Sequence, residues 1–253
     1  MATAAPCASS IAFGVGCHHE KGIHYLGDSK YEKAISSFTK SLKLVMQLLN
    51  AQEEEQVEVH SNIIPISPRT LDGVLPTSFF HQPRKDCNSQ HSTFTRHKRN
   101  NSFGFIFRNP IYFHSQDVEH RLCHKTYASL AYILLYNLAL AHHLQAVDGT
   151  DGGGKSSQAI LKKSLCLYQA AHSVEMKERI PLTIMQTMAI VNNVGHIHSA
   201  MQNANMANEC FHRLLSAIMI IKDRGDEDSI QQLDGFLVNV THLILVPSTA
   251  VAA

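Results

Sequence analysis

Apolar side chains along the 253-residue chain recur mainly at helical spacing. Between Tyr31 and Leu49 they follow the i, i+3, i+4, i+7 rule, which predicts one helix with a single apolar stripe. Residues 127–141 are apolar on most sides, so they predict a central, buried helix. Another apolar helix is expected from about Ser229 to Val246. The pattern therefore predicts an all-α fold.

Two distant parts of the chain carry similar residues at the same spacing. Gly22, Tyr25, Ala34 and Phe38 are matched by Gly195, His198, Ala207 and Phe211, at identical offsets of 3, 12 and 16 residues. Such offsets are typical of a helical hairpin, in which a small residue lets two helices touch and Ala and Phe pack the second helix back. A third, interrupted copy is predicted between them. In its first helix, four residues have the same spacing as Val191, Val194, Gly195 and His198 of the last copy; they are Leu135, Leu138, Ala139 and His142. A Gly-rich loop follows, and the second helix then packs back with Ser164, Tyr168 and Ala171.

The pattern divides the chain into three parts. Residues 1–50 are expected to form the first hairpin, and residues 117–253 two further hairpins and a C-terminal capping helix. Residues 51–116, rich in proline and polar residues, predict a long, irregular and partly disordered insertion. Within it, the alternating aromatic side chains of residues 103–113 predict an extended segment packed on the helices.

These residues resemble the tetratricopeptide repeat, and the Asn-bearing strings at Asn137 and Asn193 look like the first helices of kinesin-light-chain-type repeats. The resemblance implies a short α-solenoid of about three degenerate hairpins, with a concave groove whose asparagines bind the backbone of an extended peptide. The groove residues that it implies are Tyr136, Asn137, Leu140, His143, Asn192, Asn193, His196 and Ser199, with His19, Ile23 and Leu26 from the first hairpin. Glu20 stands where the other hairpins have asparagine, and the basic residues of a carboxylate clamp are missing.

Composition narrows the possible partners and the location. With 22 basic and 21 acidic side chains the formal charge is +1, which gives no global case for binding nucleic acid or an anionic membrane. No stretch is expected to approach membrane-spanning length, and the N-terminus lacks the features of a secretory signal. The six scattered cysteines are expected to be reduced thiols, mostly in helix cores. A cytoplasmic or nuclear location fits best.

Three motifs suggest other chemistry. Gly149–Ser156 satisfies the phosphate-loop expression, with Lys155 for phosphate and Ser156 for magnesium, but a long helix is predicted where a β-strand is needed. His19, His143 and His196 could line one groove and bind a metal, although packing or groove polarity is the simpler role. Cysteines without a Cys/His signature predict no catalytic nucleophile.

The sequence therefore predicts a non-enzymatic interaction or scaffold module that binds a peptide or partner protein and needs no metal or cofactor. A nucleotide-binding protein that uses Gly149–Ser156 is the alternative from another class. A purely structural spacer with a filled groove is the third possibility. A subsidiary hypothesis places residues 103–113 in the groove as an internal ligand.

Overall fold

The computed structural model describes residues 8–60, 104–113, 123–149, 155–224 and 233–245. These residues contain seven α-helices and no β-strand, so the predicted all-α class is confirmed. The helices are α1 (Ala8–Gly27), α2 (Tyr31–His60), α4 (His124–Asp148), α5 (Lys155–Glu178), α6 (Ile184–Ala200), α7 (Ala204–Arg224) and α9 (Asp234–Leu245).

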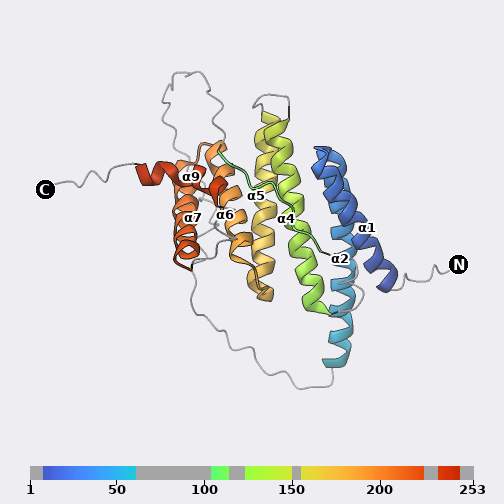
Figure 1. The fold of residues 1–253 in the computed structure, drawn as a ribbon. Coiled ribbons are helices and arrows are strands. Elements are labelled where there is room, and N and C mark those ends of the chain that lie inside the picture. Colours follow the sequence, from blue (N-terminus) through green and yellow to red (C-terminus); the bar gives the residue numbers. More distant parts are fainter. Residues whose placement is uncertain (1–7, 61–103, 114–122, 150–154, 225–232, 246–253) are drawn as a thin grey trace, which may run out of the picture.

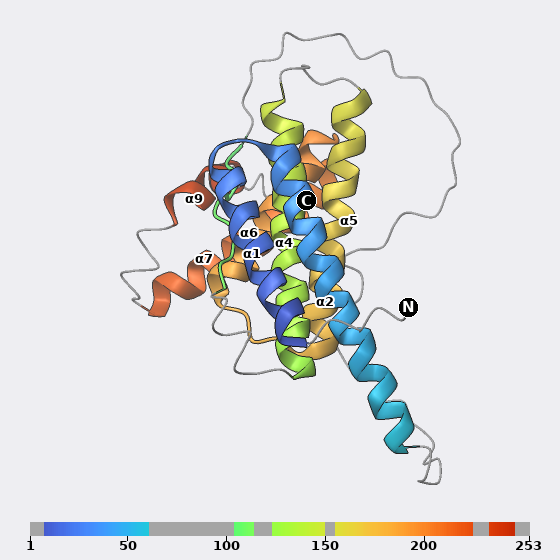
Figure 2. The same ribbon diagram turned by 90° about the vertical axis from the view of Figure 1, so that its right-hand side faces the viewer.

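Each helix packs on its neighbours in the chain: α1 on α2, α2 on α4, α4 on α5, α5 on α6, α6 on α7 and α7 on α9. Figure 1 shows α1, α2, α4, α5, α6 and α7 side by side in this order, with α9 lying crosswise next to the last two, and Figure 2 shows the bundle from the side of α1 and α2. Residues 104–113, which we call the strap, are extended and cross the helices as the green trace in Figure 1.

Contacts between glycine and phenylalanine explain the repeated spacing. A Cβ atom added at Gly22 would collide with the Phe38 ring, and one added at Gly195 would lie 2.8 Å from Cε1 of Phe211. In both hairpins the helix backbone thus approaches an aromatic ring so closely that a side chain is excluded.

The middle hairpin has other residues at the contact between its two helices. Ser164, Tyr168 and Ala171 are fully buried, as their expected place on the returning helix requires. The hydroxyl of Ser164 donates a hydrogen bond of 2.7 Å to the carbonyl oxygen of Ala139, across the contact between α5 and α4.

Helix α4 corrects one expectation. It is long and apolar enough to span a membrane, so the prediction that no stretch approaches that length is wrong. Of its most apolar window, 72% is buried inside the structure, where α4 packs between α2 and α5. Its hydrophobicity is accounted for by a central position among the helices.

Some element boundaries differ from those expected. Helix α2 continues to His60, so the start of the predicted 51–116 insertion is helical. Residues 61–103 and 114–116 lie outside the described residues. The last helix begins at Asp234, and Ser229, near which the sequence places its start, lies outside the described residues. Helix boundaries are hard to predict because solvated turns carry no apolar periodicity.

Replacing Gly22 with alanine should destabilise the fold, because the added methyl group overlaps the Phe38 ring inside the first hairpin. We expect Gly22→Ala to lower the free energy of unfolding by about 1–3 kcal/mol relative to Gly27→Ala. Gly27 is the matched control, since a Cβ atom there has nothing within 4 Å. Urea denaturation followed by circular dichroism measures both, and equal stability of the two variants would contradict the proposed close contact.

Candidate peptide-binding site

Three asparagine side chains from three helices hold the backbone of the strap. Asn239 on α9 accepts a hydrogen bond from the Phe105 N–H at 2.8 Å and donates to the Phe105 carbonyl at 2.7 Å. Asn193 on α6 makes the same pair of bonds with Phe107, at 2.9 and 3.0 Å. Asn137 on α4 does so with Ile111, at 2.9 and 2.8 Å.

The register of these bonds follows from extended backbone geometry. In an extended chain, the N–H and C=O of one residue point to the same side, and those of the next residue point to the other. A carboxamide carries an acceptor and a donor side by side, so it can bind both groups of one residue as a neighbouring strand would. The strap therefore presents Phe105, Phe107 and Ile111, all an even number of residues apart, to the helices.

A second set of amide bonds fixes the asparagines themselves. Asn192 donates to the Phe105 carbonyl and to Oδ1 of Asn193, and accepts from Asn239 at 2.7 Å. Asn193 also donates to the Tyr168 hydroxyl at 3.0 Å. Asn137, Asn192 and Asn193 have no exposed surface, and their hydrogen bonds offset the cost of burying amides.

Aromatic side chains of the strap pack at its two ends. The Phe107 ring stacks on Phe236 of α9 at 5.4 Å between centroids, and Phe105 meets the same ring edge-on. A Cβ atom at Gly235 would collide with the Phe105 ring, so the glycine makes room for it. At the other end, Phe113 stacks on His19 of α1 with centroids 3.9 Å apart.

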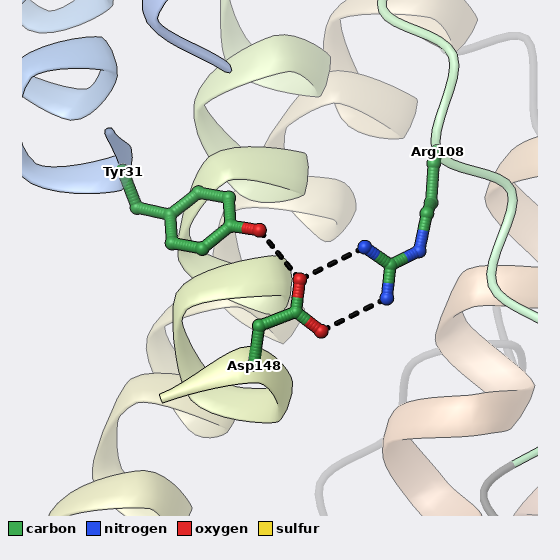
Figure 3. A network of polar contacts seen from close by, with 3 residues as sticks. All are labelled: Tyr31, Arg108 and Asp148. Carbon is green, nitrogen blue, oxygen red and sulfur yellow. Dashed lines mark hydrogen bonds and ion pairs between the residues drawn. The ribbon is translucent and has the colours of Figure 1, made fainter. Parts of the chain in front are cut away.

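One charged contact joins the centre of the strap to the helices. The guanidinium of Arg108 donates two hydrogen bonds, of 2.8 and 2.9 Å, to the carboxylate of Asp148, and the Tyr31 hydroxyl donates to the same carboxylate (Figure 3). The Arg108 hydrogen bonds are the main reason that the pKa of Asp148 lies below its ordinary value. Strap, α2 and α4 thus meet at one carboxylate.

Buried histidines lie among these contacts. Nε2 of His143 is 3.0 Å from Nδ1 of His196, and Nε2 of His19 is 3.2 Å from the Ile111 carbonyl oxygen. Burial lowers the pKa of His19 and of His196 to about 4. Burial, and after it the nearby titratable ring of His196, lowers the pKa of His143 well below its ordinary value. At neutral pH these three rings are therefore uncharged.

The predicted groove residues are brought together in part. Asn137, Asn192 and Asn193 contact the strap backbone, and the Tyr136 hydroxyl lies 3.4 Å from the Asn109 carbonyl. Of the remaining predicted groove residues, Leu140, His143, His196, His19, Ile23 and Leu26 are buried, whereas Ser199 is exposed. Strap residues 104–113 lie on the asparagines as the subsidiary hypothesis requires, and residue 103 lies outside the described part of the chain.

Sequence reasoning missed Asn239, Phe236 and the Asp148 contact. Asn239 had a usable signal, because it interrupts an apolar helix between Val238 and Val240 much as Asn137 does between Tyr136 and Leu138. No sequence signal pointed to Asp148, since its partners Tyr31 and Arg108 are distant in sequence.

The other candidate sites look different in the structure. Helix α4 ends at Asp148 and α5 begins at Lys155, so the phosphate-loop-like segment follows a helix, and its residues 150–154 lie outside the described part. No group of three or more potential metal ligands gathers among the described residues.

The cysteines fit their expected place only in part. Cys210 is buried, and burial raises the pKa of its thiol to about 12. Cys123 and Cys166 are exposed, so the expectation that they are buried is wrong.

No protein-family model, curated protein or solved structure matches this chain.

Acid should destabilise the folded chain. His19, His142 and His196 have pKa values of about 4 in the folded state against 6.5 ordinarily, so unfolding is accompanied by proton uptake between these values. The stability is fully present above pH 6.5 and is lost as the pH falls towards 4, by up to about 1.4 kcal/mol per pH unit for each histidine. Urea unfolding at pH 7.5, 5.5 and 4.5 measures this slope.

Substitution of single histidines tests whether the buried histidines cause this dependence of stability on pH. His19→Gln and His196→Gln should each flatten it, because the substituted side chain takes up no proton on unfolding. Asn205→Gln, which removes no titratable group from an exposed position on α7, is the control and should leave the slope unchanged. A slope that survives both site substitutions would contradict the assignment.

Proposed function

We propose that this protein is a non-enzymatic interaction module that binds an extended peptide or protein segment on the surface now covered by the strap. The observation that carries the proposal is the capture of both backbone groups of Phe105, Phe107 and Ile111 by asparagine side chains. Backbone capture of this kind works for any extended segment, as strand addition does at a sheet edge. Specificity then comes from the side chains that flank the asparagines.

Within this proposal, the helices form a short solenoid of degenerate tetratricopeptide-like hairpins with α9 as the cap. Support comes from the matching contacts of Gly22 with Phe38 and of Gly195 with Phe211, and from the packing of each helix on its neighbours. The partner is a peptide or protein, rather than nucleic acid or membrane, and the location is the cytoplasm or nucleus.

A structural role is the second candidate, and the buried strap favours it. Ile106 is 6% exposed and the asparagines are buried, so the strap completes the surface that a partner would otherwise use. In this version the strap stays in place and the module serves as a spacer or assembly subunit. The two candidates differ in whether removing the strap exposes a binding surface.

Replacing Asn137, Asn192 and Asn193 together with alanine should reduce recovery of a partner at least tenfold in a quantitative pull-down. Together these side chains make five hydrogen bonds to the strap backbone, two from Asn137, one from Asn192 and two from Asn193. Each such bond is worth roughly 0.5–1.5 kcal/mol. Asn205→Ala, at an exposed position on α7, is the control. Unchanged recovery by a triple variant with a native circular dichroism spectrum would exclude backbone capture of the partner.

Deleting residues 90–113 should increase partner recovery, because it removes the strap from Asn137, Asn193 and Asn239. Deletion of residues 66–89 shortens the chain equally while leaving the strap intact, and it should leave recovery unchanged. If a folded 90–113 deletion recovers no more partner than the control, the structural role is favoured instead.

A further inference from the structure

The contacts between strap and helices fall into two kinds. The hydrogen bonds of the four asparagines, together with those of Tyr136 and His19, involve the strap backbone and do not depend on its sequence. The contacts of the second kind involve strap side chains and can discriminate between sequences. Among these, Arg108 makes a bidentate ion pair, with a partner on α4.

The carboxylate that binds Arg108 belongs to one helix and accepts a hydrogen bond from a second helix. Asp148 is the last residue of α4, and Tyr31, which donates a hydrogen bond to it, is the first residue of α2. The tyrosine hydroxyl and the Arg108 guanidinium approach the same oxygen, Oδ2, and the guanidinium also reaches Oδ1 (Figure 3). The Tyr31 bond therefore fixes the orientation in which the carboxylate meets a cation.

The position of Asp148 is itself unfavourable without a cation. The carbonyl groups at the C-terminal end of a helix carry a partial negative charge, and a carboxylate there adds to it. Arg108 offsets both charges, while neighbouring His143 and His196 are uncharged at neutral pH. The site therefore favours a cation over a neutral or acidic side chain.

We propose, resting on the function proposed above, that Asp148 and Tyr31 select partner segments that carry an arginine. The strap is the template for such a partner. The arginine would follow directly after the residue held by Asn193 and precede the residue held by Asn137 by three positions. Aromatic residues would take the places of Phe105, Phe107 and Phe113 on the rings of Phe236 and His19.

Arginine fits this site better than lysine. Both carboxylate oxygens of Asp148 accept from separate guanidinium nitrogens, an arrangement that an ammonium group cannot reproduce. Because the Arg108 side chain is 51% exposed, solvent screens the pair and the selectivity is modest.

Peptide titration of the full-length chain tests the proposal. The receiving chain has residues 104–113 replaced by an equal number of glycine and serine residues, and the probe is a fluorescent peptide of residues 104–113. We expect the natural peptide to bind about fivefold tighter than its Arg108→Ala form, with the Arg108→Lys form in between. The difference should disappear when the receiving chain carries Asp148→Asn.

The outcomes separate this proposal from the one on which it rests. Equal affinity for the natural and Arg108→Ala peptides overturns arginine selection. Backbone capture still stands in that case if Asn193→Ala in the receiving chain abolishes binding. Failure of a folded receiving chain to bind any of the peptides overturns both proposals.

If the receiving chain does not fold, hydrogen exchange in the intact protein decides the matter. Arg108→Ala should speed exchange of the Phe107 and Ile111 amides about fivefold, and Arg108→Lys less. In an Asp148→Asn background, Arg108→Ala should cause no further change, as a double-mutant cycle requires for one shared interaction. Unchanged exchange in the Arg108→Ala protein overturns the proposal.

Discussion

The pairing of asparagine carboxamides with the strap backbone is the interaction on which the other features of the site depend. An extended segment without a neighbouring strand has no backbone partners of its own, and leaving its N–H and C=O groups buried and unpaired costs about 1–3 kcal/mol each. Asn137, Asn193 and Asn239 supply those partners for three strap residues. The reverse also holds, because the buried amides would lose their partners without the strap.

The strap also connects the two groups of buried side chains among the described residues. One group spans α1 to α6 and includes Cys210 of α7, and the second joins Met188 of α6 to α7 and α9. Phe107 packs against both groups, and its backbone is held by Asn193 of α6. A single extended segment thus links the C-terminal helices to α4 and, through Phe113, to α1.

The helix side chains near the strap include uncharged buried histidines and a charged carboxylate, that of Asp148. Burial keeps His19, His143 and His196 uncharged at neutral pH. The contribution of His19 and His196 to stability therefore depends on pH between about 4 and 6.5. Asp148, which remains partly exposed, keeps its charge because Arg108 and Tyr31 bond to it. As the pH falls, the buried histidines therefore take up protons at a pH where the ion pair of Arg108 and Asp148 is still intact.

The sequence by itself determined the helical class, the spacing of the Gly22 and Gly195 hairpins, and the importance of Asn137, Asn192 and Asn193, because periodicity and short motifs are local properties. It could also have pointed to Asn239, an amide within an apolar helix. Only the tertiary structure decided that Asp148 meets Arg108 and Tyr31, and which strap residue each asparagine holds. Those pairings join residues from distant parts of the chain, so their register depends on how the helices pack and leaves no local pattern.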